Sequence, residues 1–195
     1  MIGSWMKQRV RVIGRNIYWG IRGRSFVNPD LPAQPTTVLY ICKGNICRSP
    51  FAEHVSVSLA ERMGFGGITF ASAGFEVTEP RRPPSDALAT ANGFGIVLAG
   101  HRSRRLTPEL VSDSDLLVVM EADQLLWLRR TYRAHSGKMI LLPLLDPDRS
   151  GGAAFRFNID DPYGREPGYY QNCFERISRC VEVLLGSHVR SVPRL

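Results

Sequence analysis

The sequence has no long apolar run and few cysteines. None of its hydrophobic stretches approaches the roughly 20 residues that a membrane-spanning helix needs. The N-terminus lacks the uninterrupted apolar core and the cleavage site of a secretory signal. Four cysteines in 195 residues are typical of a protein from a reducing compartment and not of a disulfide framework. We therefore expect a cytoplasmic protein.

Acidic residues are scarce at the N-terminus, and this shortage accounts for most of the net charge. Residues 1–34 hold six basic side chains and one carboxylate, so they carry +5 of the overall +7 and leave +2 for the rest. The positive charge is thus concentrated in residues 1–34 and is not spread over the whole protein. We expect no nucleic-acid partner. The length and composition fit one globular domain with its own core.

The basic N-terminal extension, residues 1–35, has an apolar pattern of its own. Val10, Ile13, Ile17 and Ile21 recur at helical spacing among arginines. One hypothesis is an amphipathic helix that contacts an anionic membrane surface or an acidic partner. The alternative is a partly disordered arm that packs loosely on its own domain or on a neighbour. Residues 36–187 then form the domain, and 188–195 a short basic tail.

The most informative stretch runs from residue 37 to residue 50. Residues 37–41 are apolar and predict a buried strand. Gly44-Asn45 predicts a tight turn, since both residue types tolerate a positive φ. Ser49-Pro50 is typical of a helix start, with the serine as cap. A strand, a tight loop and a helix N-terminus in this order form a cradle of N–H groups that binds anions.

Within this cradle the residue types indicate phosphoryl transfer. Cys42 lies among N–H groups near a helix N-terminus, and such surroundings lower the pKa of a thiol. Arg48 can hold two phosphate oxygens at once. Attack by the Cys42 thiolate on phosphorus would give a phosphocysteine, which Ser49 can help to release by donating to the sulfur. Asn45 can hold the strained turn. The remaining members of the predicted phosphate-binding loop are Lys43, Gly44, Ile46 and Cys47.

The motif Cys-x-Gly-Asn-Ile-Cys-Arg-Ser-Pro resembles the signature of the low-molecular-weight protein tyrosine phosphatases, in particular the bacterial type. The resemblance covers roughly residues 36–187 and implies a phosphatase that needs no cofactor and no metal. It also implies supporting roles for His101, which would hydrogen-bond towards Asn45, and for Ser72. Further matches are Ser72-Ala73-Gly74, His101-Arg102-Ser103-Arg104, residues 115–121 and Asp161-Pro162-Tyr163-Gly164.

Four strands alternating with helices predict a parallel sheet with helices on both faces, a three-layer α/β fold. This is the flavodoxin-like plan that the resemblance implies. The phosphate-binding loop would lie at the carboxyl edge of the first strand, where such sheets bind ligands. The expected strands are residues 37–41, 68–71, 116–120 and 138–142, and the expected helices are 51–63, 85–92, 121–133 and 167–185.

Residues 143–161 form a long stretch predicted to be irregular, and such loops are often functional. By the resemblance, Asp161 is the general acid for the departing tyrosine oxygen and then the base for water. Asp160 is either a neighbour that raises the pKa of this acid or, as we favour, a capping or solvent-facing carboxylate. Tyr163 would stack on the substrate ring. By the resemblance, the loop 75–84 with Phe75 borders the same cleft; the alternative is a solvated loop.

The other cysteines allow two interpretations. Cys47 lies five residues from Cys42, and we expect that the two can form a reversible disulfide that protects the nucleophile. Cys173 and Cys180 are seven residues apart and share a helical face. They either pack that helix on the sheet, which we favour, or relay oxidation as the cysteines of arsenate reductases do.

Three functions remain open from the sequence. The first is hydrolysis of phosphotyrosine, with a bacterial tyrosine autokinase of capsule or exopolysaccharide control as the substrate that the resemblance implies. The second is arsenate reduction or phosphoarginine hydrolysis on the same fold, although arginine phosphatases of this family tend to carry threonine where this chain has Ile46. The third is a non-catalytic phosphotyrosine-binding module, which the retention of Cys42, Arg48, Ser49 and Asp161 disfavours.

Overall fold

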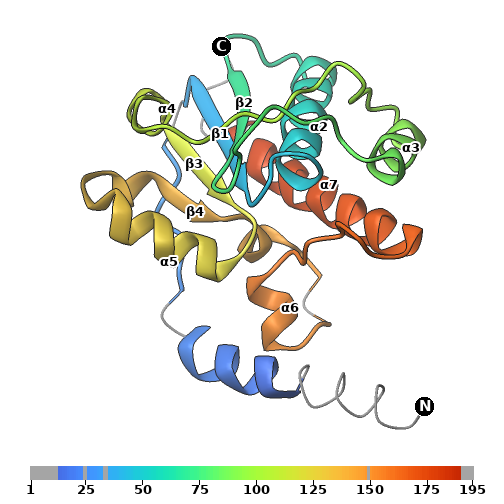
Figure 1. The fold of residues 1–195 in the computed structure, drawn as a ribbon. Helices are drawn as coiled ribbons and strands as arrows, with labels where there is room; N and C mark the ends of the chain where they lie inside the picture. The colour runs from blue at the N-terminus through green and yellow to red at the C-terminus, as the bar shows by residue number, and fades with distance from the viewer. Residues whose placement is uncertain (1–12, 24–25, 33–34, 149, 190–195) are drawn as a thin grey trace, which may run out of the picture.

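A four-stranded parallel sheet forms the centre of the molecule, with strand order β2-β1-β3-β4 (Figure 1). The computed structural model describes residues 13–23, 26–32, 35–148 and 150–189. Each neighbouring pair of strands is parallel, so the predicted three-layer α/β fold is confirmed. The strands are β1 (Thr37–Cys42), β2 (Thr69–Gly74), β3 (Leu116–Val119) and β4 (Met139–Leu141).

Helices cover both faces of this sheet. The longer ones are α2 (Arg48–Arg62), α5 (Ala122–Thr131) and α7 (Pro167–Val189). In the part of the chain that the structure describes, no helix is both long and apolar enough to pass through a bilayer. The shorter elements are α3 (Ser85–Gly93), α4 (Pro108–Asp113), η2 (Arg133–Lys138), η3 (Leu142–Leu145) and α6 (Ala153–Phe157).

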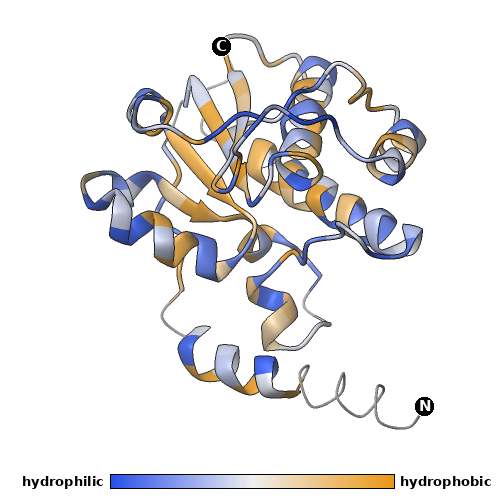
Figure 2. Cartoon of the chain, in the orientation of Figure 1, coloured by the Kyte–Doolittle hydropathy of each residue, from blue (hydrophilic) through white to orange (hydrophobic). Residues whose placement is uncertain are grey.

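Alternating side chains of β1 divide the core into two clusters. Val38 and Tyr40 face the first core cluster, which is formed with α2, α3 and α7. Leu39 and Ile41 face the second core cluster, which is formed with α4 and α5. Because successive side chains of a strand point to opposite faces, a strand buried on both faces must be apolar throughout. Figure 2 shows these apolar strands between helices whose outer sides are hydrophilic.

The start of α2 differs from the prediction. The helix begins at Arg48, three residues before the expected start, and Cys47 occupies the N-cap position without a side-chain cap. Ser49 therefore lies inside the first turn, and the prediction that it caps the helix is wrong. Its hydroxyl instead contacts the Cys42 sulfur and the Asn45 amide. The phosphate-binding loop and the first helical turn are thus one hydrogen-bonded unit.

Four short helical elements were not expected: α4, η2, η3 and α6. Helix α4 has Pro108 in its first turn and Thr107 as N-cap, whose Oγ1 accepts from the Leu110 N–H at 3.4 Å; this pattern is a recognisable helix start. Element α6 lies inside the 143–161 stretch predicted to be irregular, and η3 begins one residue before this stretch, at Leu142. α7 also extends to Val189, four residues beyond the predicted end.

The described part of the N-terminal extension packs against the domain. Residues 13–22 are helical, and the Trp19 side chain, only 3 % exposed, contacts Phe26 and Phe157 with ring centroids 5.8 and 6.4 Å away. Asn16 Oδ1 accepts from the Ala154 N–H at 2.8 Å, at the start of α6. This segment lies beside α6 in Figure 1. The predicted helical position of Val10 lies outside the described residues.

The residues that follow this helical segment reach the edge strand β4. The Asn28 side chain makes two hydrogen bonds to the backbone of Leu141: its Nδ2 donates to the carbonyl oxygen at 3.1 Å, and its Oδ1 accepts from the N–H at 2.8 Å. One side chain thus satisfies both backbone groups of a residue in β4.

Replacing Trp19 by alanine is expected to lower the free energy of unfolding by about 3–5 kcal/mol, because it removes a large buried side chain from the second core cluster. Urea denaturation of the full-length chain measures this loss. Trp127→Ala is the matched control, since that ring is half-exposed, and its loss should be smaller. A Trp19→Ala change below 1 kcal/mol would show that the extension does not pack on the domain in solution.

A buried carboxylate anchors α7 to the loop that leads to the predicted acid. Asp146 accepts from Arg176 Nε at 2.7 Å and from Arg179 Nε at 3.2 Å. Burial alone would raise the pKa of Asp146, but the hydrogen bonds from Arg179 and Arg176 outweigh it, and this pKa lies below the ordinary value of a carboxyl group. Arg176 also donates to the carbonyl oxygens of Phe155 and Asn158 at 2.7 Å, which fixes this loop close to residue 160.

Asp146→Asn is expected to lower the free energy of unfolding at pH 7 by about 3–5 kcal/mol, since it leaves a buried guanidinium without its counter-charge. Because the pKa of Asp146 is depressed in the folded state, its contribution is present above the ordinary carboxyl pKa and is lost as the pH falls through the folded value. The difference between wild type and variant, measured by urea denaturation, should therefore narrow towards acid pH. Asp86→Asn, at an exposed position, should change stability by no more than about 0.5 kcal/mol.

Candidate active site

Cys42 ends β1, and the following loop turns back over its sulfur. The Asn45 N–H donates to the Cys42 Sγ at 3.3 Å, and the Ser49 Oγ lies 3.1 Å from the same sulfur. Asn45 has φ of +53°, a left-handed conformation that asparagine tolerates better than most residues. Gly44 does not share it, so the predicted positive φ falls on Asn45 alone.

Asn45 is held by four partners. Its Nδ2 donates to Ser49 Oγ at 2.9 Å and to Ser72 Oγ at 2.8 Å. Its Oδ1 accepts from the Arg104 N–H at 2.8 Å, and its backbone oxygen accepts from His101 Nε2 at 2.8 Å. The predicted contact of His101 with Asn45 is therefore found, and Ser72 and Arg104 are further partners. This network holds the strained turn in place.

The state of His101 follows from its surroundings. Burial lowers the pKa of His101, which outweighs the opposing effect of its hydrogen bond to Asn45. A neutral ring that donates through Nε2 to a carbonyl oxygen carries its lone pair on Nδ1. Ser72 in turn donates to Glu53 Oε2 at 2.5 Å, so a carboxylate of α2 supports the other side of Asn45.

Arg48 is buried, with 1 % of its side chain exposed, and binds two carboxylates. Its NH1 donates to Glu121 and to the Ile159 carbonyl oxygen at 3.0 Å, and its NH2 lies 2.7 Å from Asp161 Oδ2. Burial acts to lower the pKa of Arg48, but the negative charges of Cys42, Glu121 and Asp161 outweigh this effect. The pKa of Arg48 therefore lies above the ordinary value of an arginine. Within the described residues, its Nε is one of few buried side-chain donors that lack an acceptor.

Glu121 has a place in the site that was not assigned from the sequence. It follows β3 directly and binds Arg48, and Gln124 Nε2 donates to its Oε1 at 2.9 Å. The available signal was its position: β3 lies next to β1, and the carboxyl ends of parallel neighbours meet at one edge. A carboxylate placed there comes close to whatever follows β1.

The loop opens into a cavity of about 420 Å³. Asp161 lies in its wall, together with Tyr163, whose ring is half-exposed. Arg81 NH2 donates to the Tyr163 hydroxyl oxygen at 3.3 Å, which fixes the outer wall of the cavity. The lining residues are Cys42, Lys43, Gly44, Ile46, Cys47, Glu76, Arg81, Asp161, Tyr163 and Arg165.

Phe75 is not among the residues that line this cavity, contrary to the prediction. Its ring packs edge-on against Trp127 of α5, with centroids 4.8 Å apart, on the side of the second core cluster. The backbone N–H of Phe75 donates to the Cys42 carbonyl oxygen at 3.1 Å. The residue thus stays near the loop through its backbone while its side chain covers α5.

Asp160 and Asp161 point to different partners. Asp160 Oδ1 lies 2.6 Å from Arg15 NH2, and both side chains are exposed, which agrees with the interpretation of Asp160 as a solvent-facing carboxylate. The pairing with the N-terminal extension was not indicated by the sequence. Asp161 faces Arg48 instead. The carboxylates of Asp160 and Asp161, although adjacent in sequence, thus bind different arginines.

All four cysteines are buried and unbridged. Cys173 and Cys180 lie in the core cluster between α7 and the sheet, as the packing interpretation predicts. Burial raises the pKa of Cys173 to about 12 and also raises that of Cys47. The protonated thiols of these two residues are therefore favoured over thiolates.

Comparison with known proteins places the chain in one family. The family model described as "Low molecular weight phosphotyrosine protein phosphatase" matches residues 37–193. The probable low molecular weight protein-tyrosine-phosphatase AmsI of Erwinia amylovora is 34% identical over 159 residues, which are 81% of this chain and 98% of that protein. EpsP of Ralstonia nicotianae, described in the same words, is 30% identical and covers 75% of this chain and 91% of its own length.

Solved structures of similar proteins superpose on this chain. The tyrosine phosphatase Wzb from Escherichia coli K30, crystallised in complex with sulphate, superposes with a TM-score of 0.68 at 25% identity, covering 79% of this chain and 99% of its own. The YwlE arginine phosphatase, at 24% identity and a TM-score of 0.67, shares the fold and covers 77% of this chain and 94% of its own. With a thiol, a buried guanidinium and a carboxylate around one loop, and with these relatives, the chain belongs to the low molecular weight phosphotyrosine protein phosphatase family.

Proposed function

We propose that Cys42, Arg48 and Asp161 carry out hydrolysis of a phosphate monoester through a phosphocysteine. The observation that carries this proposal is one cavity whose lining includes Cys42 and Asp161, with the Asn45 N–H donating to the Cys42 sulfur and the Arg48 guanidinium paired to Asp161. The unpaired Arg48 Nε supports it, because a buried donor without an acceptor is costly until an anion satisfies it.

In the first step the Cys42 thiolate attacks phosphorus, and the bond from phosphorus to the leaving oxygen breaks. The proton on Asp161 passes to that oxygen. In the unliganded protein Arg48 NH2 lies 2.7 Å from Asp161 Oδ2. A phosphate bound to this guanidinium would therefore lie beside the Asp161 carboxyl group, which can pass its proton to the leaving oxygen.

In the second step water attacks the phosphorus of the phosphocysteine, the phosphorus–sulfur bond breaks, and Asp161 accepts the proton of the water. The electron pair returns to the Cys42 sulfur, towards which the Ser49 hydroxyl can donate from 3.1 Å. Loop N–H groups and Arg48 would stabilise the equatorial oxygens in both steps.

Acid quenching of Asp161→Ala with a phosphotyrosine peptide, followed by mass spectrometry, should find phosphate on the peptide that contains Cys42.

We infer that the substrate is phosphotyrosine and not phosphoarginine. Ile46 lines the cavity, whereas the arginine phosphatases of this family tend to carry threonine at this position, and the half-exposed Tyr163 ring can stack on a substrate ring. Turnover of matched phosphotyrosine and phosphoarginine peptides tests this inference. Wild type should prefer phosphotyrosine, and Ile46→Thr should narrow the preference. Preferential phosphoarginine turnover by wild type would overturn it, and thioredoxin-coupled arsenate turnover would support the reductase alternative.

We propose that the protein substrate is a tyrosine autokinase at the cytoplasmic face of a membrane, in exopolysaccharide or capsule control, and that the extension 1–35 brings the domain 36–187 to this surface. Ile13, Ile17 and Ile21 share one helical face, and each is more than half exposed. Together with the +5 charge of residues 1–34, this face suits an anionic membrane. A pull-down with Asp161→Ala from the host cell tests the partner.

Vesicle sedimentation tests the membrane contact. The full chain should sediment with vesicles rich in anionic lipid and not with zwitterionic ones. Ile17→Glu should weaken this binding about tenfold or more, since burying an isoleucine contributes about 1.5–3 kcal/mol. Val97→Glu is the matched control, because Val97 is equally exposed on the domain and should have no effect. Equal losses of vesicle binding in Ile17→Glu and Val97→Glu would contradict the proposed membrane contact.

A further inference from the structure

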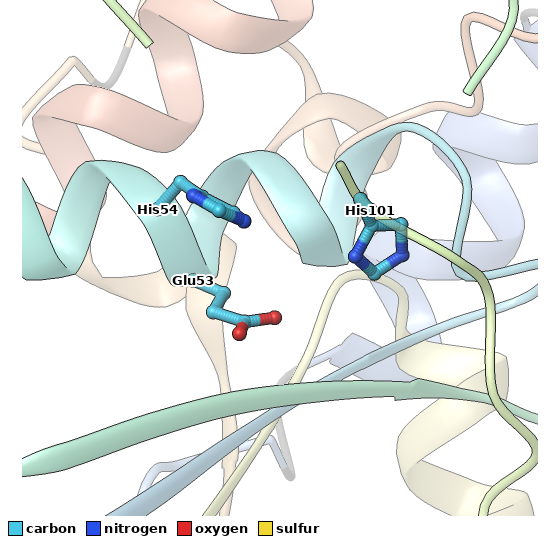
Figure 3. Close-up of side chains that lie close together, drawn as sticks. All are labelled: Glu53, His54 and His101. Carbon is cyan, nitrogen blue, oxygen red and sulfur yellow. The ribbon is translucent and has the colours of Figure 1, made fainter. Parts of the chain in front are cut away.

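Three side chains with metal-binding chemistry gather behind the phosphate-binding loop. Glu53 and His54 are neighbours on α2, and His101 lies in the loop that follows α3. Each offers one ligand atom, these atoms all lie within 4.8 Å of one another, and all three residues are partly buried. Figure 3 shows the Glu53 carboxylate and the two imidazole rings close together. None of the three contacts the cavity that holds Cys42.

The hydrogen bond of His101 prepares its ring for a cation. Its Nε2 donates to the Asn45 carbonyl oxygen at 2.8 Å, so the lone pair of the neutral ring is on Nδ1. This nitrogen lies on the side of the ring that faces Glu53 and His54 (Figure 3). A histidine that binds a metal through one nitrogen and donates to a carbonyl through the other is the common arrangement in metalloproteins.

Glu53 is oriented in the same way. Its Oε2 accepts from the Ser72 hydroxyl at 2.5 Å, which leaves Oε1 as the oxygen that a cation would take. Two of the three ligands therefore have a hydrogen-bond partner that holds them in place. The ordinary explanation of the cluster, a carboxylate that supports His101, accounts for these two residues but gives no role to His54.

We propose that Glu53, His54 and His101 bind a divalent cation of the zinc class, with water as a further ligand. Two imidazoles and one carboxylate are a donor set that suits Zn²⁺ and disfavours Mg²⁺ or Ca²⁺, which prefer oxygen ligands alone. Ligand distances of about 2.0–2.2 Å in a tetrahedral site require ligand atoms roughly 3.4 Å apart. Rotation of the partly exposed side chains closes the separation of up to 4.8 Å.

The bound cation would hold both supports of Asn45. His101 binds its carbonyl oxygen, and Ser72, which donates to Glu53, accepts from its side chain. The cation takes no part in the phosphoryl transfer. It stabilises the turn whose N–H contacts the Cys42 sulfur, and because it binds the folded chain it should raise the melting temperature.

Zinc binding is measured best in the full-length Cys42→Ser variant, because a cysteine thiolate in the loop can itself bind zinc. Competition with a chromophoric chelator gives the affinity, and thermal unfolding with and without Zn²⁺ gives the stabilisation. His54→Ala is added to remove one proposed ligand, and His135→Ala removes a partly exposed histidine of η2 as the matched control. Hydrolysis of p-nitrophenyl phosphate by metal-free His54→Ala, with Cys42 intact, checks that this substitution leaves the fold unchanged.

We expect one zinc ion per chain, an affinity at least about tenfold weaker in His54→Ala, by analogy with the cost of disturbing a metal site, and no change in His135→Ala. Co²⁺ in place of Zn²⁺ should give the visible bands of a four-coordinate site without a thiolate charge-transfer band. An unchanged zinc affinity in His54→Ala, a thiolate band, or no binding at micromolar zinc would each overturn the proposal. The zinc affinity, the Co²⁺ bands and the thermal unfolding do not use turnover, so these tests are independent of the proposed catalytic roles.

Discussion

Replacing Cys42 by serine is expected to lower kcat for p-nitrophenyl phosphate by about 10⁴-fold or more, since removing a nucleophile that acts together with its loop abolishes nearly all of the acceleration. A serine hydroxyl is a far weaker nucleophile than a thiolate, whereas the hydrogen-bonding capacity of the loop is retained. Steady-state kinetics measure the loss, and inorganic phosphate should still protect the variant against thermal unfolding.

The control for this experiment is Cys180→Ala, which removes another buried thiol. Cys180 belongs to the core cluster around α7, so its loss should reduce stability and leave the kcat of the folded enzyme nearly unchanged. Hydrolysis by Cys42→Ser at more than about a hundredth of the wild-type rate would contradict the assignment of the nucleophile, whatever the source of the remaining activity.

Asp161→Asn is expected to lower kcat for a phosphotyrosine peptide by about 10²–10⁴-fold, the usual contribution of a general acid. Tyrosinate is a basic leaving group, with a pKa of about 10 for its conjugate acid, and departs slowly without a proton. p-Nitrophenolate is a much weaker base, so the same substitution should slow p-nitrophenyl phosphate less. The ratio of the two losses, measured by steady-state kinetics, reports proton donation directly.

Asp160→Asn is the matched control for Asp161, because it is the adjacent carboxylate and faces Arg15 instead of Arg48. We expect its kcat to stay within about twofold of wild type, given how little exposed ion pairs contribute. If both variants lost the same activity, or if Asp161→Asn slowed both substrates equally, the carboxylate would act in some way other than by protonating the leaving group.

The sheet was predictable from the sequence because it rests on local patterns. β1, β3 and β4 are short, mostly apolar runs, and β3 (Leu116–Val119) is buried at every position, so periodicity and composition agree. The parts that were missed depend on tertiary contacts. Helix α6 packs against Trp19 of the N-terminal segment through Phe157, and nothing in the residues 153–157 alone indicates this partner.

The same distinction applies to the candidate site. Cys42, Arg48 and Asn45 lie within one contiguous motif whose chemistry follows from residue type and spacing. Glu121 and Arg104 reach the loop from other elements, so their roles required the arrangement in space. The direction of the Phe75 side chain likewise depends on Trp127 of α5, which sequence order places far away.

The double hydrogen bond from Asn28 to β4 has a consequence for the behaviour of the chain at high concentration. An uncovered edge strand offers N–H and C=O groups that can pair with a strand of another molecule. By engaging both groups of Leu141, one amide side chain blocks the extension of the sheet into a neighbouring copy. A chain trimmed before residue 35 would keep the phosphate-binding loop but expose the edge of β4. Its tendency to self-associate would therefore rise independently of its catalytic site.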